Sequence, residues 1–136
     1  MDKKRILSKI DELNSYLDEI EKIKPSTFGE YKNSIEKKRA NERLLQILIE
    51  TIIDICNILV SGLKLGLPSD EDEVIKKLEK KKIISKEMSE ILKDMKGFRN
   101  ILVHKYGAVD DELVFEMLSE RLNDFNKFKE EVLSKI

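Results

Sequence analysis

The chain has 136 residues, of which 39% are charged and 40% hydrophobic, and it contains only 5 glycines and 2 prolines. This composition is typical of one all-α domain spanning residues 1–136, because helices with short loops need few glycines and prolines. The 26 basic and 27 acidic residues give a net charge of −1. That balance excludes a positive field over the whole molecule that would bind nucleic acid nonspecifically.

The first predicted helix runs from about Lys3 to Lys24, and Pro25 follows its end. Its apolar side chains recur at helical spacing along one face: Ile6, Ile10, Leu13, Leu17 and Ile20. The charged start of the chain leads into this amphipathic helix rather than into the apolar segment of a signal peptide. We therefore expect a cytoplasmic protein. A connection follows over residues 25–33, in which Phe28 and Tyr31 are expected to pack on the bundle.

The second predicted helix runs from about Ser34 to Ser61 and is apolar over most of its circumference between Leu44 and Val60. Its polar side chains fall on one narrow line: Glu36, Arg39, Arg43, Gln46, Glu50, Asp54 and Asn57. Charged residues inside the apolar run argue against a membrane span, so no membrane is expected. Such a helix is buried, either partly by a second protomer in a homodimer, which we favour, or entirely by its own chain.

Two carboxylates of this polar line, Glu50 and Asp54, lie one turn apart. They are candidates to orient an arginine or to raise the basicity of a histidine if the functional site faces this helix. A metal site is not expected, because the Glu-x-x-His pairs of a di-metal bundle are missing. A solvated stripe is the simpler interpretation, so both residues are supporting candidates only.

The remaining segments are also predicted to be helical. A short helix over about 72–80 is capped by Ser69 or Asp70, and the next helix begins after Ser85 and ends at Gly107. Its apolar stripe consists of Met88, Ile91, Met95, Phe98 and Leu102. The final helix starts at Asp110 or Asp111 and presents another apolar face, made of Val114, Leu118, Phe125, Phe128 and Val132.

The segment 98–107, FRNILVHKYG, contains the only histidine of the chain. At 100° per residue, Asn100 and His104 share a face that points away from the apolar stripe, whereas Arg99 lies on the flank. One straight helix does not bring the three side chains together, so a second element must complete a site. Arg99, Lys105 and the lysine run 80–82 are candidates for a local RNA-binding patch, although a solvated helix end is the simpler interpretation of that run.

The side chains of this segment suit metal-independent RNA cleavage. The reaction needs a base for the 2′-hydroxyl proton and a cation for the charge that gathers on the phosphoryl oxygens. Imidazole and guanidinium have these properties, so His104 and Arg99 are the catalytic candidates. Asn100 can fix the imidazole or bind a phosphate oxygen, and Tyr106 can stack on a base or donate a hydrogen bond to phosphate.

The pattern RNxxxHxY near the end of a helix, after a long apolar helix and before a last amphipathic one, resembles the HepT-like toxins of the HEPN superfamily. The resemblance implies a dimeric, antiparallel bundle of four to five helices. It also implies a metal-independent endoribonuclease without a cofactor, with Arg99 and His104 as catalytic residues. In such type VII toxin–antitoxin pairs, a MntA-like nucleotidyltransferase neutralises the toxin by transferring AMP to the tyrosine that corresponds to Tyr106.

Two other classes of function stay open at this point. A catalytically inactive HEPN-type module could bind a nucleotide, or a protein such as a nucleotidyltransferase, through the same surface. A purely structural helical dimer would not need Asn100 and His104 on an outward face. A neighbouring reading frame for a nucleotidyltransferase would favour the toxin.

Overall fold

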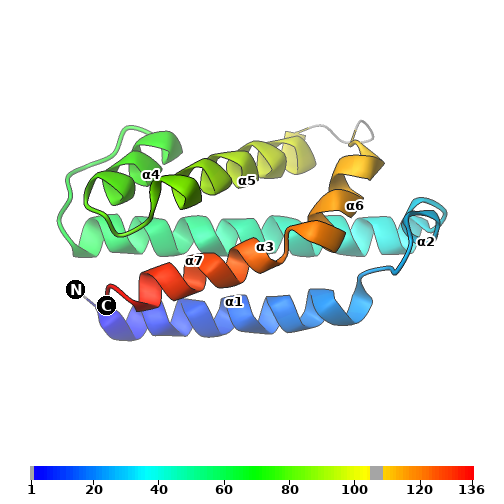
Figure 1. Cartoon of the computed structure of the whole chain (residues 1–136), viewed down its shortest axis with the longest axis horizontal. Helices are drawn as coiled ribbons and strands as arrows, with labels where there is room; N and C mark the ends of the chain where they lie inside the picture. Colours follow the sequence, from blue (N-terminus) through cyan, green and yellow to red (C-terminus); the bar gives the residue numbers. More distant parts are fainter. Residues whose placement is uncertain (1, 105–108) are drawn as a thin grey trace.

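The computed structural model describes residues 2–104 and 109–136, and these residues form helices without any strand. The helices are α1 (Lys3–Ile23), α2 (Phe28–Lys32), α3 (Ile35–Gly62), α4 (Glu71–Lys80), α5 (Lys86–His104), α6 (Asp111–Glu120) and α7 (Asn123–Leu133). Along the bundle, α1, α3, α5 and α7 alternate in direction, and both termini lie at the same end (Figure 1). With α4 beside α5, this arrangement confirms the predicted all-α antiparallel bundle.

The central helix is α3, which contacts α1, α2, α4 and α5. Between Leu44 and Val60, only Asp54 and Asn57 are exposed. The chain itself therefore covers most of the apolar circumference of α3, which is the alternative that we favoured less from the sequence. The apolar surface of this helix supplies no argument for a second protomer.

By length and composition α3 would also suffice to cross a membrane, but 56% of its most apolar window is buried inside the bundle.

The expected final helix is in fact two helices, because the chain bends at Arg121. That residue adopts φ −117° and ψ 4°, and its Nε donates to the Asp124 carboxylate at 3.3 Å. The bend lets α6 pack against α2 across one end of the bundle, while α7 contacts α5 and returns toward the end that holds the termini (Figure 1). One straight helix would not reach both partners. At the α2 contact, the rings of Phe28 and Phe115 meet edge to face, with centroids 5.7 Å apart.

The connection after α1 contains the short helix α2, where sequence analysis expected no helix. Thr27 begins α2 by accepting a hydrogen bond from the backbone N–H of Glu30 at 3.2 Å. Tyr31 is fully buried, as is typical of an aromatic side chain that anchors a connection to a core. The expected packing of Phe28 and Tyr31 is confirmed.

Two lysines end helices in the left-handed conformation that glycine usually adopts. Lys64 has φ 54° after α3, and Lys82 has φ 59° after α4. After α4, the N–H of Ile83 bonds to the carbonyl of Leu78 at 2.9 Å and that of Lys82 to the carbonyl of Glu79 at 2.9 Å. This is the Schellman arrangement, which satisfies the last carbonyls of a helix. At Lys82 it comes with the steric cost of a side chain at positive φ.

The single cysteine lies in the core. Cys56 is 2% exposed, and burial raises the pKa of its thiol to about 12. The thiol therefore stays protonated at neutral pH and behaves as a small apolar group, as expected from its place in an apolar helix.

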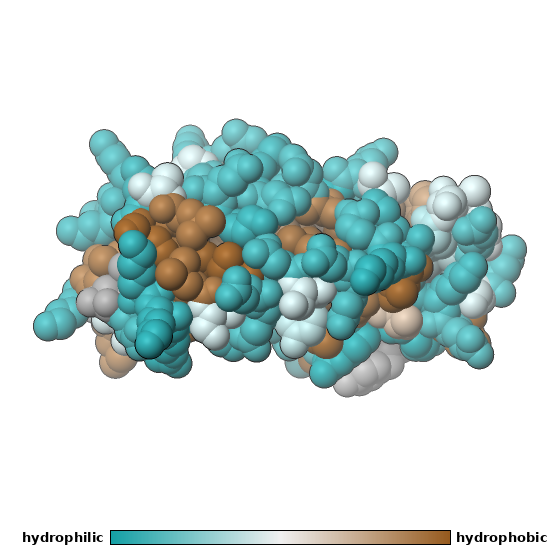
Figure 2. Space-filling view, turned by 90° about the horizontal axis from the view of Figure 1, so that it is seen from below, coloured by the Kyte–Doolittle hydropathy of each residue, from teal (hydrophilic) through white to brown (hydrophobic). Residues whose placement is uncertain are grey.

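Seen from below, the broadest apolar patch of this face lies toward the end of the bundle that holds both termini, and smaller apolar areas follow along the rest of the face (Figure 2). Two of the exposed large apolar side chains, Leu7 at 39% and Leu133 at 43%, belong to the first turns of α1 and the last turn of α7. Both helix ends lie at this end of the molecule, whereas the end of α5 points toward α6 (Figure 1).

Candidate functional site

The helix that carries the polar motif is fixed at its start. The Ser85 hydroxyl oxygen accepts from the backbone N–H of Met88 at 3.0 Å, which confirms the predicted N-terminal cap of α5. The Glu131 carboxylate of α7 in turn accepts from the Ser85 N–H at 2.6 Å and from its hydroxyl at 3.1 Å. The predicted apolar stripe of α5 faces the core: Met88, Met95, Phe98 and Leu102 are buried and Ile91 is half-buried.

His104 is the last residue of α5 and is exposed, so its imidazole lies off the core face as the helical period predicted. Asn100, one turn earlier, is half-buried, as are the apolar neighbours Ile101 and Val103. Tyr106, the expected site of AMP attachment, lies outside the described residues, as does Lys105. The histidine is therefore placed where it can meet a substrate, at the C-terminal end of a helix.

Arg99 is the most constrained side chain of the motif, with 14% of its side chain exposed. Its Nε donates to the Asn100 side-chain oxygen at 3.0 Å, and its Nη2 donates to the Glu71 carboxylate at 2.5 Å. Asn100 thus holds the guanidinium in this structure rather than the imidazole. Of the five guanidinium N–H groups, these contacts use two, and the planar fork is set in one orientation.

The element that contacts the motif from outside α5 is the first turn of α4. Glu71 pairs with Arg99, and its neighbour Asp72 pairs with Lys96, whose Nζ lies 2.6 Å from the Asp72 carboxylate. The hydrogen bond from Lys96 is the largest cause of the lowered pKa of Asp72. Two adjacent carboxylates of α4 therefore hold two cations that lie three residues apart on α5.

Glu50 and Asp54 are placed elsewhere. Glu50 accepts from the Gln46 side-chain amide at 3.0 Å, and Asp54 pairs with Lys9 of α1 at 3.6 Å. Among the described residues, neither carboxylate has a hydrogen bond or ion pair with the motif. The carboxylate beside Arg99 is Glu71 of α4 and not one of the supporting candidates on α3, whose contacts agree with the simpler interpretation of a partly solvated stripe.

Sequence reasoning missed Glu71 because its segment, Asp70–Glu73, has an ordinary local explanation. Carboxylates in the first turn of a helix stabilise the helix dipole, and the Asp70 carboxylate caps α4 by accepting from the N–H of Glu73 at 2.8 Å. The only available signal was the acidic first turn of the helix that directly precedes the one carrying Arg99. Nothing in the sequence distinguished Glu71 from its neighbours as the partner.

No cluster of three or more His, Cys, Asp or Glu side chains suited to a metal ion occurs within residues 2–104 and 109–136. The chemical groups that the described site offers are one imidazole, one oriented guanidinium and one amide. A guanidinium with free N–H groups binds phosphate oxygens, and an exposed imidazole can exchange protons with a substrate.

The bundle is similar to solved structures of toxins. A tri-AMPylated HEPN toxin of Shewanella oneidensis in complex with an MNT antitoxin superposes with a TM-score of 0.89 and 26% identity, and the match covers 98% of this chain and 99% of that one. A toxin–antitoxin structure with AMP-PNP gives a TM-score of 0.87 and 25% identity over 95% and 97% of the two chains. The fold, together with the polar motif at the end of α5, places the chain in the HEPN class.

Sequence comparisons narrow this class. The family described as Ribonuclease HepT-like matches residues 13–132. The tRNA nuclease HepT of Aphanizomenon flos-aquae is 30% identical over 129 residues, which cover 95% of this chain and 88% of that protein. The mRNA nuclease HepT of Shewanella oneidensis is 33% identical over 84 residues, 62% of this chain and 63% of that protein. The chain belongs to the HepT-like ribonuclease family, in agreement with the resemblance of its motif.

Proposed function

We propose that this chain is the toxin of a type VII toxin–antitoxin pair and cleaves RNA without a metal ion. The observation that carries the proposal is the guanidinium of Arg99, oriented by Glu71 and Asn100, on the same helix end as the exposed His104. Two HepT relatives are named as a tRNA nuclease and an mRNA nuclease, which supports RNA as the proposed substrate class. We expect the protein to act in the cytoplasm.

In the proposed reaction His104 removes the proton of a 2′-hydroxyl, and that oxygen attacks the adjacent phosphorus. The phosphoryl oxygens gain negative charge, which the free N–H groups of Arg99 stabilise. The bond to the 5′-oxygen of the next nucleotide then breaks, and that oxygen takes a proton from water while the imidazolium returns its proton to the solvent. The products are a 2′,3′-cyclic phosphate and a free 5′-hydroxyl. Orientation of the guanidinium before substrate binds reduces the cost of positioning it in the transition state.

A second copy of the chain is expected to complete this site. Arg99 turns toward α4, whereas His104 is exposed at the end of α5. If two motifs face each other across a homodimer, the Arg99 of one copy and the His104 of the other can meet one phosphate. The half-buried Ile101 and Val103 offer apolar surface beside the motif for such a contact.

The proposed partner is a MntA-like nucleotidyltransferase that acts as antitoxin. It would join the Tyr106 hydroxyl oxygen to the α-phosphorus of ATP and release pyrophosphate. The similar toxin of Shewanella oneidensis is described as tri-AMPylated and in complex with an MNT antitoxin, which supports this assignment. An AMP group near the motif adds a phosphate that competes with RNA for Arg99.

Cleavage of single-stranded RNA in the presence of EDTA tests the function. Wild-type protein should cut the RNA, and His104→Ala and Arg99→Ala should each lower the rate by roughly a hundredfold or more, since losing one charge-stabilising contact costs about 3 kcal/mol. Circular dichroism should show unchanged helix content in both variants. Cleavage that needs magnesium, or that survives both substitutions, refutes the assignment. An RNA-binding chain that cuts nothing supports the alternative of an inactive HEPN-type binding module.

A further inference from the structure

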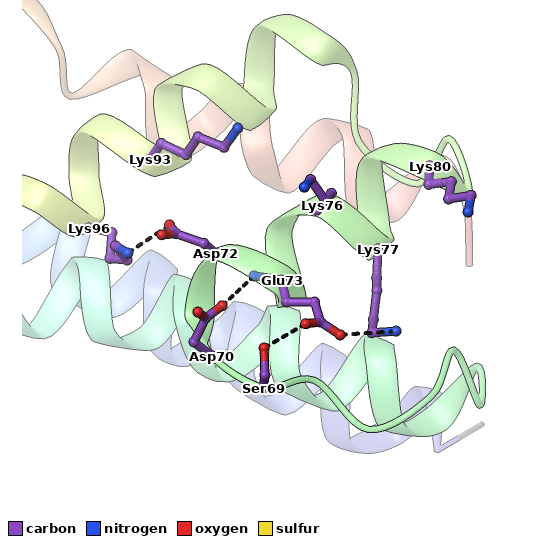
Figure 3. A pocket seen from close by; sticks show the side chains of 9 residues that line it. All are labelled: Ser69, Asp70, Asp72, Glu73, Lys76, Lys77, Lys80, Lys93 and Lys96. Atoms are coloured by element: carbon purple, nitrogen blue, oxygen red, sulfur yellow. Dashed lines mark hydrogen bonds and ion pairs between the residues drawn. The ribbon is translucent and has the colours of Figure 1, made fainter.

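A groove of about 810 Å³ lies between α4 and α5, next to the ion pairs that hold the motif (Figure 3). Five lysines line this α4–α5 groove: Lys76, Lys77, Lys80, Lys93 and Lys96. Three carboxylates from the start of α4 also line it, so the groove carries a charge of +2 on a chain whose net charge is −1. The composition of the whole chain conceals this local concentration of positive charge.

Two of the five lysines are neutralised by carboxylates of α4. Lys96 pairs with Asp72 at 2.6 Å, and Lys77 lies 3.5 Å from the Glu73 carboxylate and donates to the carbonyl of Leu65 at 3.1 Å. The Glu73 carboxylate also accepts from the Ser69 hydroxyl at 2.6 Å. The third carboxylate, Asp70, accepts from the N–H of Glu73 at 2.8 Å, so all three acidic groups of the groove have hydrogen-bond partners (Figure 3).

The other three lysines have no ion pair with any residue that the structure describes. Lys76 and Lys93 extend from the two facing helices into the space between them, and Lys80 continues the row along α4 (Figure 3). All three are exposed. The Asp72 carboxylate, which pairs with Lys96, also attracts Lys93. The three unpaired ammonium groups share one surface, and a bound anion reduces their mutual repulsion.

The groove continues the surface of the proposed active site. On α5, Lys93, Asn100 and His104 are spaced by seven and four residues, so they lie along one face of the helix. On α4, Lys76 and Lys80 are one turn apart, about 6 Å along the axis. At the motif end of the groove, Glu71 and Asp72 hold Arg99 and Lys96. A nucleic-acid strand that has one phosphate at the motif can therefore extend over the groove.

The distribution of these charges favours the backbone of a nucleic acid over a single nucleotide. The cations are spread along two helices rather than gathered around one phosphate. The described residues that line the groove include no aromatic side chain on which a base would stack. Lysine contacts to phosphate position a strand but carry no sequence information. The groove accordingly suits a ligand with repeated negative charges and any base sequence.

We propose that the α4–α5 groove binds the phosphate backbone of the RNA strand that the motif cleaves, with Lys76, Lys80 and Lys93 as the contacting residues. This inference rests on the proposed ribonuclease function. It adds the location of the RNA segment that flanks the cleaved bond. The main competing ligand is an acidic surface of a partner protein such as the antitoxin.

The test measures binding of a fluorescein-labelled single-stranded RNA to full-length protein carrying His104→Ala, which prevents cleavage. The triple change Lys76→Gln, Lys80→Gln and Lys93→Gln should weaken binding roughly tenfold or more at about 0.1 M salt. It should also reduce the slope of log Kd against log salt by about 2, because each phosphate contact contributes about 0.7 for a single strand. The single change Lys93→Gln should reduce the slope by about 0.7.

A matched control removes the same charge elsewhere, with Lys4→Gln, Lys22→Gln and Lys135→Gln, all at exposed positions outside the groove. This control should bind RNA like the parent protein. Equal affinity and salt slope in the groove variant overturn the inference, while cleavage by wild-type protein would leave the proposed function intact. A groove variant that keeps RNA affinity but no longer binds the antitoxin shows a protein-docking surface and also overturns it. A wild-type chain that neither binds nor cuts RNA refutes both proposals.

Discussion

Arg99 of α5 and Glu71 of α4 form an ion pair between two helices, with the arginine Nη2 2.5 Å from the glutamate Oε1. The arginine side chain is 14% exposed and the glutamate 38%. Solvent screening limits the contribution of such a partly exposed pair to stability to roughly 0.5–1 kcal/mol. Its main consequence is geometric, because the guanidinium has a fixed orientation before any phosphate arrives.

The first prediction concerns this positioning role. Glu71→Gln should lower RNA cleavage roughly tenfold, equivalent to about 1.4 kcal/mol, because a neutral amide holds the guanidinium less firmly. Helix content should not change. Glu90→Gln is the matched control, since Glu90 is exposed on α5 and has no ion pair among the described residues. A Glu71→Gln protein that is as active as wild type, or more active, would show that Glu71 competes with phosphate instead of orienting Arg99.

The second prediction concerns Tyr106. Co-expression with the cognate nucleotidyltransferase should add the mass of one or more AMP groups to the wild-type chain, and Tyr106→Phe should abolish the addition because it lacks the attacking hydroxyl oxygen. Intact-mass spectrometry measures this directly. Tyr31→Phe is a suitable control, because Tyr31 is fully buried and cannot reach another enzyme. An unmodified wild-type chain that is still neutralised would point to simple occlusion by the partner.

The third prediction is that the chain forms a homodimer through the surface beside the motif. Sedimentation at micromolar concentration should give a dimer for the wild type. Ile101→Glu should shift the equilibrium toward monomer, because it buries a charge in the proposed contact. Leu7→Glu, in an exposed apolar position at the other end of the bundle, should leave the dimer unchanged. If the wild-type protein sediments as a monomer at every concentration, the proposal of a site shared by two copies is wrong.

The fourth prediction tests the helix end at Lys82. Lys82→Gly should stabilise the protein by about 0.5–1 kcal/mol, since glycine adopts φ 59° without the steric cost of a Cβ. Thermal unfolding should show a rise in Tm of roughly 3 °C. Lys81→Gly is the control: Lys81 has φ −85°, so glycine gains nothing there and should destabilise by about 0.5 kcal/mol through added chain entropy. Equal changes in Tm for Lys82→Gly and Lys81→Gly would contradict the prediction that the positive φ of Lys82 destabilises the protein.

Much of this protein is already determined by its sequence. The apolar period places α1, α3 and the start of α5 within a residue or two, whereas the predicted end of α5 at Gly107 lies outside the described residues. The same period puts His104 off the core face. These properties depend on the neighbours of a residue along one helix, which the sequence gives directly. The motif and its position between two helices likewise identified the family that the comparisons show.

Only the tertiary structure decided which elements meet. It placed Glu71 rather than Glu50 or Asp54 beside Arg99, and it brought lysines of α4 and α5 together across one groove. It also covered α3 with its own chain and bent the last helix at Arg121 to reach two partners. Ion pairs act over a few ångströms between side chains that are distant in sequence. Which side chains form ion pairs therefore depends on how the helices pack against one another. The apolar period of a single helix does not predict that packing.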